Sequence, residues 1–188
     1  MCRPRRPGNL LPMLVSYYVA MSLDGFIAKP DGDIHWLSAV ERPGEDYGYA
    51  AFYSTVEAVL IGRATYDLCL SFPEWPYTGK RTIVFSRDPA LRRHEQAEIT
   101  ADDPRDVVAR LEREGIQKAW LVGGGILATA FRELGLIDEY IVSVIPVVLG
   151  GGIPMLAPGG DLEPLRLQDA KSYPSGLVQL TYARGASG

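Results

Sequence analysis

Three short stretches combine glycine, hydroxyl and arginine residues in ways that suit the binding of a phosphate group. The first is Gly123-Gly124-Gly125 within AWLVGGGILATAF (119–131), where an apolar run enters the glycines and a helix-like run leaves them. The spacing Gly123-x-Gly125-x-x-Ala128 matches the dinucleotide fingerprint with its permitted final alanine. A glycine turn between a strand and a helix also serves packing alone, so this stretch by itself leaves both roles open.

The second stretch is AVLIGRATYD (58–67), in which a buried strand ends at Gly62 and a helix follows. The N-terminus of a helix presents unpaired N–H groups and a partial positive charge, which attract phosphate. Arg63 adds a guanidinium group and Thr65 adds a hydroxyl donor at this turn. A capped helix with a surface arginine would have the same pattern, so the phosphate role depends on a further segment.

That further segment is IVFSRDP (83–89), which ends another strand with Ser86 and Arg87. Arg63 and Arg87 together suit a 2′-phosphate, which favours NADPH over NADH. In an open α/β sheet, ligands bind at the carboxyl ends of the strands, where all three stretches fall. An ordinary Rossmann domain is excluded, because its glycine turn follows the first strand and an acid ends the second. Here the glycines come late in the chain, and YIVSVIPVV (140–148) carries no acid.

Alternating strand and helix patterns must position these residues. We expect strands at 14–22, 57–62, 81–86, 97–100, 118–122 and 139–150, helices at 44–56, 63–72, 102–114 and 126–134, and a loop at 24–37. Two strand-like halves at the end of the chain are joined by Pro174-Ser175-Gly176, which is typical of a hairpin turn. The pattern predicts an α/β fold with a mostly parallel central sheet flanked by helices and a C-terminal antiparallel hairpin.

Composition limits the class of protein. The 188 residues predict a single domain over 13–185, preceded by a proline-rich flexible tail over 1–12. The net charge of −4 argues against a nucleic-acid partner, and no apolar run is long enough to span a membrane. Cys2 and Cys69 form no disulfide framework, which favours the cytoplasm. The two histidines lie far apart in the sequence, so we expect no metal site.

Five motifs together resemble the dihydrofolate reductase superfamily. They are AMSLDGFIA, LIGRATYD, TIVFSR, LVGGG and LIDEYIVSVIPVVLGGGIPM, and the resemblance covers most of residues 14–184. The sequence is most similar to the branch that holds the C-terminal reductase domain of bacterial riboflavin-biosynthesis proteins and its stand-alone homologues. The resemblance implies a dihydrofolate-reductase-like fold and NADPH as the cofactor.

The resemblance also implies which residues contact that cofactor. Ala20 and Ile27 would line the nicotinamide end, and Ser86 and Arg87 would flank the adenosine. The 2′-phosphate and pyrophosphate would be held by Gly62, Arg63, Ala64 and Thr65, and the pyrophosphate and nicotinamide side would be wrapped by Val122, Gly123, Gly124, Gly125, Ile126 and Leu127. The three consecutive glycines would then serve close approach of the backbone as well as turning.

A catalytic carboxylate is implied at Asp46, by its distance in sequence from Gly62, with Glu45 as the neighbouring alternative. Asp24 of the SLDG motif is a second candidate, since this motif lies near the nicotinamide in the riboflavin branch. Asp46 could equally favour the N-terminus of its helix, and Asp24 could bond its own turn. The expected substrate contacts are an apolar wall of Tyr49, Phe52 and Tyr53 and a lid at Trp36.

The sequence thus predicts a cytoplasmic NADPH-dependent reductase that transfers hydride to a C=N or C=C bond of a small pterin-like or pyrimidine-like heterocycle. KPDGDIHWL (29–37) replaces the usual proline-tryptophan loop of folate reductases, and the fused deaminase domain of the riboflavin proteins is missing. We therefore expect neither dihydrofolate nor the ribosylated pyrimidine as substrate. The alternatives are a flavin-linked reductase and a non-catalytic nucleotide-binding relative. Relatives in the riboflavin branch commonly pair, so we also expect a homodimer.

Overall fold

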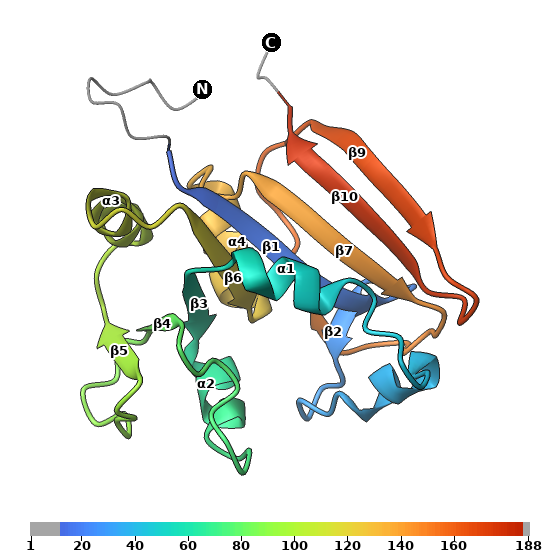
Figure 1. Cartoon of the computed structure of the whole chain (residues 1–188), viewed down its shortest axis with the longest axis horizontal. Helices are drawn as coiled ribbons and strands as arrows, with labels where there is room; N and C mark the ends of the chain where they lie inside the picture. The colour runs from blue at the N-terminus through green and yellow to red at the C-terminus, as the bar shows by residue number, and fades with distance from the viewer. Residues whose placement is uncertain (1–11, 186–188) are drawn as a thin grey trace.

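The computed structural model describes residues 12–185, so the predicted tail lies outside the described residues except for Pro12. One long sheet crosses the molecule, with helices on both faces (Figure 1). The strands are β1 (Leu14–Ser22), β2 (Phe26–Ala28), β3 (Ala58–Gly62), β4 (Arg81–Phe85), β5 (Ala97–Thr100), β6 (Lys118–Gly123), β7 (Glu139–Ile145), β8 (Ile153–Pro154), β9 (Leu165–Ser172) and β10 (Val178–Arg184). The helices are η1, a 3-10 helix (His35–Val40), α1 (Tyr49–Thr55), α2 (Arg63–Cys69), α3 (Pro104–Arg113) and α4 (Gly125–Glu133).

The eight-stranded sheet has the order β5-β4-β3-β6-β1-β7-β10-β9. Neighbours from β5 to β7 are parallel, whereas β10 runs antiparallel to both β7 and β9. The turn between β9 and β10 lies at the predicted place and closes with a hydrogen bond of 2.9 Å from Tyr173 N to Leu177 O. Gly176 in this turn has φ +88°, which favours glycine. The predicted α/β class, parallel centre and antiparallel hairpin are confirmed.

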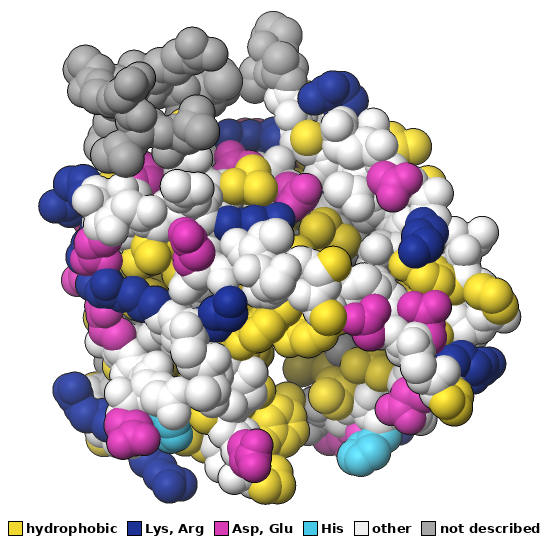
Figure 2. Space-filling view, viewed as in Figure 1, with side chains coloured by type: hydrophobic (Ala, Val, Ile, Leu, Met, Phe, Trp, Pro, Cys, Tyr) yellow, Lys and Arg dark blue, Asp and Glu magenta, His cyan; other side chains and the backbone are white. Residues whose placement is uncertain are grey.

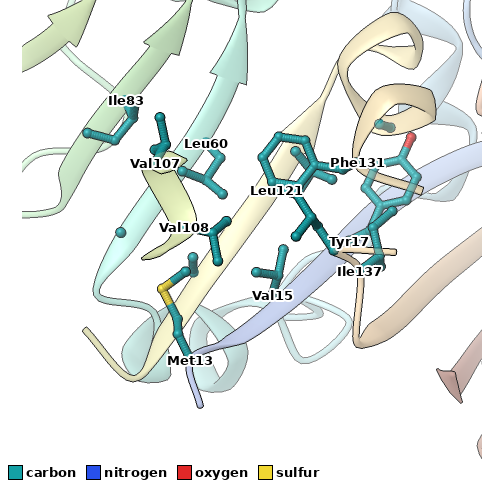
Figure 3. Close-up of a cluster of buried hydrophobic side chains, with 14 of the residues drawn as sticks. Met13, Val15, Tyr17, Leu60, Ile83, Val107, Val108, Leu121, Phe131 and Ile137 are labelled. Atoms are coloured by element: carbon teal, nitrogen blue, oxygen red, sulfur yellow. The ribbon is translucent and has the colours of Figure 1, made fainter. Parts of the chain in front are cut away.

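Helices α3 and α4 cover one face of the sheet (Figure 3). Val107 of α3 lies beside Leu60 of β3 and Ile83 of β4, and Phe131 of α4 lies beside Leu121 of β6; each of these side chains is at most 1% exposed. Burying a side chain of this size stabilises the fold by about 1.5–3 kcal/mol. These strands alternate buried side chains between two covered faces, which is why their sequences are apolar without a polar side.

Helices α1 and α2 cover the opposite face, where aromatic side chains dominate the packing. Phe52 of α1 and Tyr66 of α2 are buried against Trp120 of β6 and Ile61 of β3. A third, smaller cluster joins η1 to β7 and the C-terminal hairpin through Ile145 and its neighbours. Every layer therefore meets the sheet through buried apolar side chains.

Several predicted boundaries are wrong, and helix α2, expected to reach residue 72, ends at Cys69. The helix expected from residue 44 begins only at Tyr49, because Gly48 has φ +80° and cannot continue a right-handed helix. The long strand expected over 139–150 ends at Ile145, since Pro146 has no N–H to donate to the sheet. The loop expected over 24–37 contains β2 and the start of η1.

Candidate active site

The two glycine turns lie side by side at the carboxyl edge of the sheet. Gly62 ends β3 and Gly123 ends β6, and these strands are hydrogen-bonded neighbours. A Cβ atom built on Gly62 would lie 3.6 Å from Gly123 O and 3.8 Å from Gly124 N. A Cβ atom on Gly124 would lie 3.8 Å from the Thr65 hydroxyl oxygen. The starts of α2 and α4 therefore form one joint surface.

The glycines at this surface differ in what requires them. Gly123 has φ +114°, and a Cβ atom on Gly125 would lie only 2.4 Å from Pro154 O, so turning and packing explain both. Gly62 and Gly124 have negative φ values, and a Cβ atom on either would make only ordinary contacts. Their lack of a side chain leaves bare backbone at the surface. This is the arrangement that a closely approaching phosphate needs.

Helix α4 also begins without a side-chain cap. Its N-cap residue, Gly124, makes no side-chain hydrogen bond, whereas Asp103 caps α3 by accepting a bond of 2.8 Å from Arg105 N. The first N–H groups of a helix have no partner within it, so those of α4 are available to a ligand. The predicted cap and Pro104 start of α3 are both present, whereas α2, whose N-cap residue is Gly62, begins without a side-chain cap as α4 does.

Arg63, one of the two predicted 2′-phosphate ligands, is engaged by two carboxylates. Its Nε lies 3.2 Å from Asp67 Oδ2, and its Nη1 donates to Asp88 Oδ2. Asp88 is held in place by Ala90 N, which donates to Asp88 Oδ1 at 2.9 Å. Arg87 is exposed, and its side chain makes no hydrogen bond or ion pair within residues 12–185. A phosphate would bind Arg87 directly but would have to displace a carboxylate from Arg63.

A cleft of about 420 Å³ adjoins the glycine turns on the side of β4 and β5. Its lining comprises Phe85, Ser86, Arg87, Thr100, Ala101, Asp102, Asp103, Pro104, Leu127 and Ala130. Three residues assigned to the cofactor by sequence thus meet in one cleft, two from the end of β4 and one from α4. Ile126, next to them on α4, is 89% exposed, which leaves an apolar side chain for a ligand to cover.

A second cleft, of about 720 Å³, opens beside β1 and β7. It is lined by Tyr18, Ala20, Leu37, Val40, Glu41, Arg42, Pro43, Glu45, Asp46, Tyr47, Ser143, Ile145 and Leu177. Figure 2 shows this face of the molecule hollowed in the lower half of the view, with hydrophobic side chains inside the hollow. Ala20, assigned to the nicotinamide end, thus shares a cleft with both carboxylates of the Glu45-Asp46 pair.

Asp46 is an exposed carboxylate that caps the start of α1. Its two oxygens accept hydrogen bonds of 2.9 Å from Gly48 N and 3.0 Å from Ala50 N. The bonds from Ala50 N and Gly48 N, in that order, lower the pKa of Asp46. At neutral pH the side chain is therefore an ionised hydrogen-bond acceptor with lone pairs left over for a ligand.

Asp24 holds two loops together. Its oxygens accept bonds of 3.0 Å from Leu149 N and 2.7 Å from Gly150 N. A hydrogen bond from Ser22, followed by these backbone bonds, lowers the pKa of Asp24 to about 2. A carboxyl group with this pKa carries no proton to donate at neutral pH. Asp24 therefore accepts structural hydrogen bonds, and these come from the segment after β7.

The aromatic residues predicted as a substrate wall are not part of the lining of the second cleft. None of Tyr49, Phe52, Tyr53 and Trp36 lines either cleft. Phe52 stacks on Tyr18 with ring centroids 4.4 Å apart, so Tyr18 is the aromatic side chain presented to the cleft. Sequence reasoning missed Tyr18, although its alternation with the buried Tyr17 placed it on the other face of β1.

Within residues 12–185, no group of three or more His, Cys, Asp or Glu side chains is placed to bind a metal ion. No helix in this described part of the chain is both long and apolar enough to cross a membrane.

Comparison with known proteins now defines the class. Residues 14–178 match the RibD C-terminal domain family, and the chain belongs to that family. YwjB, an uncharacterized protein of Bacillus subtilis (strain 168), is 41% identical over 168 residues, which cover 89% of this chain and 95% of YwjB. The predicted resemblance to the reductase domain of riboflavin-biosynthesis proteins is confirmed.

Solved structures agree on the fold. A protein from Shewanella sp. PV-4 with a riboflavin-biosynthesis name superposes with a TM-score of 0.83 at 29% identity, covering 92% of this chain and 99% of that one. The diaminohydroxyphosphoribosylaminopyrimidine deaminase/5-amino-6-(5-phosphoribosylamino)uracil reductase of Thermotoga maritima superposes with a TM-score of 0.70 at 16% identity. The match covers 93% of this chain and 57% of the Thermotoga protein. The dihydrofolate-reductase-like architecture is thereby confirmed.

Proposed function

We propose that this protein is an NADPH-dependent reductase that transfers hydride to a C=N or C=C bond of a small pterin-like or pyrimidine-like heterocycle. The observation that carries the proposal is the bare glycine surface of Gly62 and Gly124 at the uncapped start of α4. A cleft adjoins this surface on the β4 side, and a second one opens beside β1. Membership in the RibD C-terminal domain family, which includes a reductase by name, supports the same activity.

The residues present fit this cofactor. The pyrophosphate would lie on the N–H groups that begin α4, with the Thr65 hydroxyl beside it. Arg87 and Arg63 would bind the 2′-phosphate, and the adenosine would occupy the cleft at Ser86 and Leu127. NADPH, when bound, supplies the hydride, while the protein provides orientation and electrostatics.

On the substrate side, Asp46 would accept a hydrogen bond from a ring N–H at the mouth of the second cleft. Its lowered pKa supports the role of a carboxylate that favours a protonated ring, and the proton itself would then come from water. Asp46→Asn should cut turnover by about 10²–10⁴-fold, the range for acid–base contributions, and leave NADPH affinity nearly unchanged. Full activity of this variant would remove Asp46 from the mechanism, and Glu45→Gln would then be the next variant to assay.

The proposal competes with a flavin-linked reductase and with a non-catalytic nucleotide-binding relative. Fluorescence titration with NADPH and with FMN, followed by a consumption assay over pterins, pyrimidines and quinoid compounds, separates the three. NADPH binding with turnover of one panel member supports the proposal. FMN binding in preference to NADPH supports the flavin-linked alternative, and NADPH binding without any consumption supports the non-catalytic one.

We further propose that two copies of the chain pair in the cytoplasm. The C-terminal hairpin supports the pairing, because β9 is exposed along its whole length and Leu165 and Leu167 are 42% and 53% exposed. An edge strand with exposed leucines favours association with a second copy. The free, buried thiol of Cys69 fits a reducing compartment.

A further inference from the structure

Three polar side chains from neighbouring strands, Tyr18, Ser143 and Gln179, meet at the second cleft, where Tyr18 and Ser143 form part of the lining. Gln179 Nε2 lies 3.1 Å from Ser143 Oγ and 3.3 Å from the Tyr18 hydroxyl oxygen. Strand register explains the meeting, since Ser143 of β7 pairs with Ala20 of β1 on one side and with Gln179 of β10 on the other. Tyr18 lies two residues before Ala20 and so faces the same side. The cluster is therefore built into the sheet at the proposed nicotinamide end.

The hydrogen-bonding direction within this cluster is determined by a fourth group. Gln179 Nε2 also lies 3.3 Å from the carbonyl oxygen of Tyr47, which can only accept. The nitrogen of the Gln179 amide must therefore face Tyr47, and toward the two hydroxyls it can only donate. The amide nitrogen shares its two protons among these three acceptors, so each hydroxyl can only accept from Gln179, and its own proton stays available for another partner.

Those two protons have no acceptor within the described residues, where neither hydroxyl donates a hydrogen bond. Ser143 is only 5% exposed, and both side chains line the cleft. Burial raises the pKa of Tyr18, so its hydroxyl stays protonated at neutral pH. Because both side chains line the cleft, an acceptor atom of a ligand placed there can take a hydrogen bond from each hydroxyl.

We propose that Gln179 positions Tyr18 and Ser143 as paired hydroxyl donors for a carbonyl oxygen of the substrate. This inference rests on the proposed function, because it assigns the second cleft to the substrate. The apolar surroundings of the cluster, Leu37 and Ile145 among them, strengthen each hydrogen bond made there. With Asp46 accepting at the rim, the site selects a ring that carries a carbonyl group inward and an N–H group outward.

Two fluorescent pteridines of nearly equal shape test the proposal. Pteridine-2,4-dione presents carbonyl oxygens, whereas pteridine-2,4-diamine presents amino groups. The wild-type protein should bind the dione about tenfold more tightly, and Tyr18→Phe should weaken dione binding about tenfold while changing diamine binding less than twofold. Phe keeps the stacking on Phe52, so the fold is retained. Tyr182→Phe, which removes a hydroxyl on the α3/α4 face, is the matched control and should change neither affinity.

Gln179→Met tests the positioning role, since its thioether cannot donate and the two hydroxyls remain. It should reduce the preference for the dione while thermal unfolding stays cooperative. Equal binding of the two pteridines by the wild type, binding of neither, or equal weakening of both in Tyr18→Phe would overturn the proposal. NADPH titration of the same samples separates the two ideas. A wild-type protein that binds NADPH normally but shows no preference for the dione refutes only the hydroxyl pair, and a wild-type protein that prefers the dione but does not bind NADPH refutes only the proposed cofactor.

Discussion

Arg63→Ala should weaken NADPH binding by less than the loss of an unpaired arginine would, because Arg63 already forms ion pairs with Asp67 and Asp88. A hydrogen bond from a guanidinium to a phosphate is worth about 1.5–3 kcal/mol. Arg63 must first release a carboxylate, and each of its exposed pairs, with Asp67 and Asp88, is worth about 0.2–1 kcal/mol. The net loss in Arg63→Ala should be about 1–2 kcal/mol, or about 5- to 30-fold in Kd. NADH, which lacks the 2′-phosphate, should be affected far less.

The same reasoning predicts the opposite effect for Asp88→Asn. The amide oxygen can still accept from Ala90 N, as Asp88 Oδ1 does at 2.9 Å, but the charge that competes with phosphate is gone. NADPH binding should strengthen by about 0.2–1 kcal/mol, while NADH binding stays unchanged. Asp102→Asn is the control, because Asp102 lines the adjoining cleft with Ser86 and Arg87 and does not pair with Arg63.

Titration of both cofactors by fluorescence or calorimetry at low ionic strength measures these effects. Equal losses for NADPH and NADH in Arg63→Ala would refute the 2′-phosphate role of Arg63. Weaker NADPH binding in Asp88→Asn would show that the carboxylate orients Arg63 instead of competing for it. An equal gain in NADPH affinity in Asp88→Asn and Asp102→Asn would show that the effect comes from the net charge near the cleft and not from the pair between Asp88 and Arg63.

The remaining predictions concern the glycines, one loop and assembly. Gly124→Ala should leave thermal stability unchanged and lower NADPH affinity at least about tenfold, whereas Gly125→Ala should lower the melting temperature because its Cβ meets Pro154 O at 2.4 Å. Asp24→Asn should lower the melting temperature at pH 7. The difference from wild type should shrink as the pH falls from about 4 toward 2, because a lowered pKa stabilises the fold only while the carboxyl is ionised. Light scattering should give twice the monomer mass of 20.6 kDa, and Leu167→Glu should return the monomer.

Elements with one dominant local signal could be predicted from the sequence. β1 and β5 match their predicted bounds residue for residue, and α3 begins at its predicted cap because Asp103 and Pro104 are local signals. The errors arose where a single residue overrides an apolar pattern. Pro146 ends β7 within an apolar run that predicts one continuous strand. Gly48 makes α1 begin at Tyr49, later than predicted.

Within the site, the glycine turns were visible because each one directly follows a strand whose end the sequence marks. Contacts across the sequence were not visible. Asp88 reaches Arg63 from 25 residues away, and Gln179 reaches Tyr18 from 161 residues away. Sequence periodicity assigns each residue to a face of its own strand but does not say which residue of another strand lies opposite, since that depends on register.

The two sides of the site therefore differ in how they can change. The proposed cofactor side consists mainly of backbone at helix starts, and Gly124 and Gly62 would contribute by lacking side chains, so we expect it to tolerate few substitutions. The proposed substrate side consists of side chains that project from β1, β7 and β10, where one exchange at Ser143 or Gln179 would change which hydrogen bonds the cleft can donate or accept. Strand β10 pairs with β7 and β9 and is separated from β3 and β6, which carry the glycine turns. Its residues can therefore vary without moving these turns. Substitutions on β10 should thus change substrate preference while NADPH affinity stays constant.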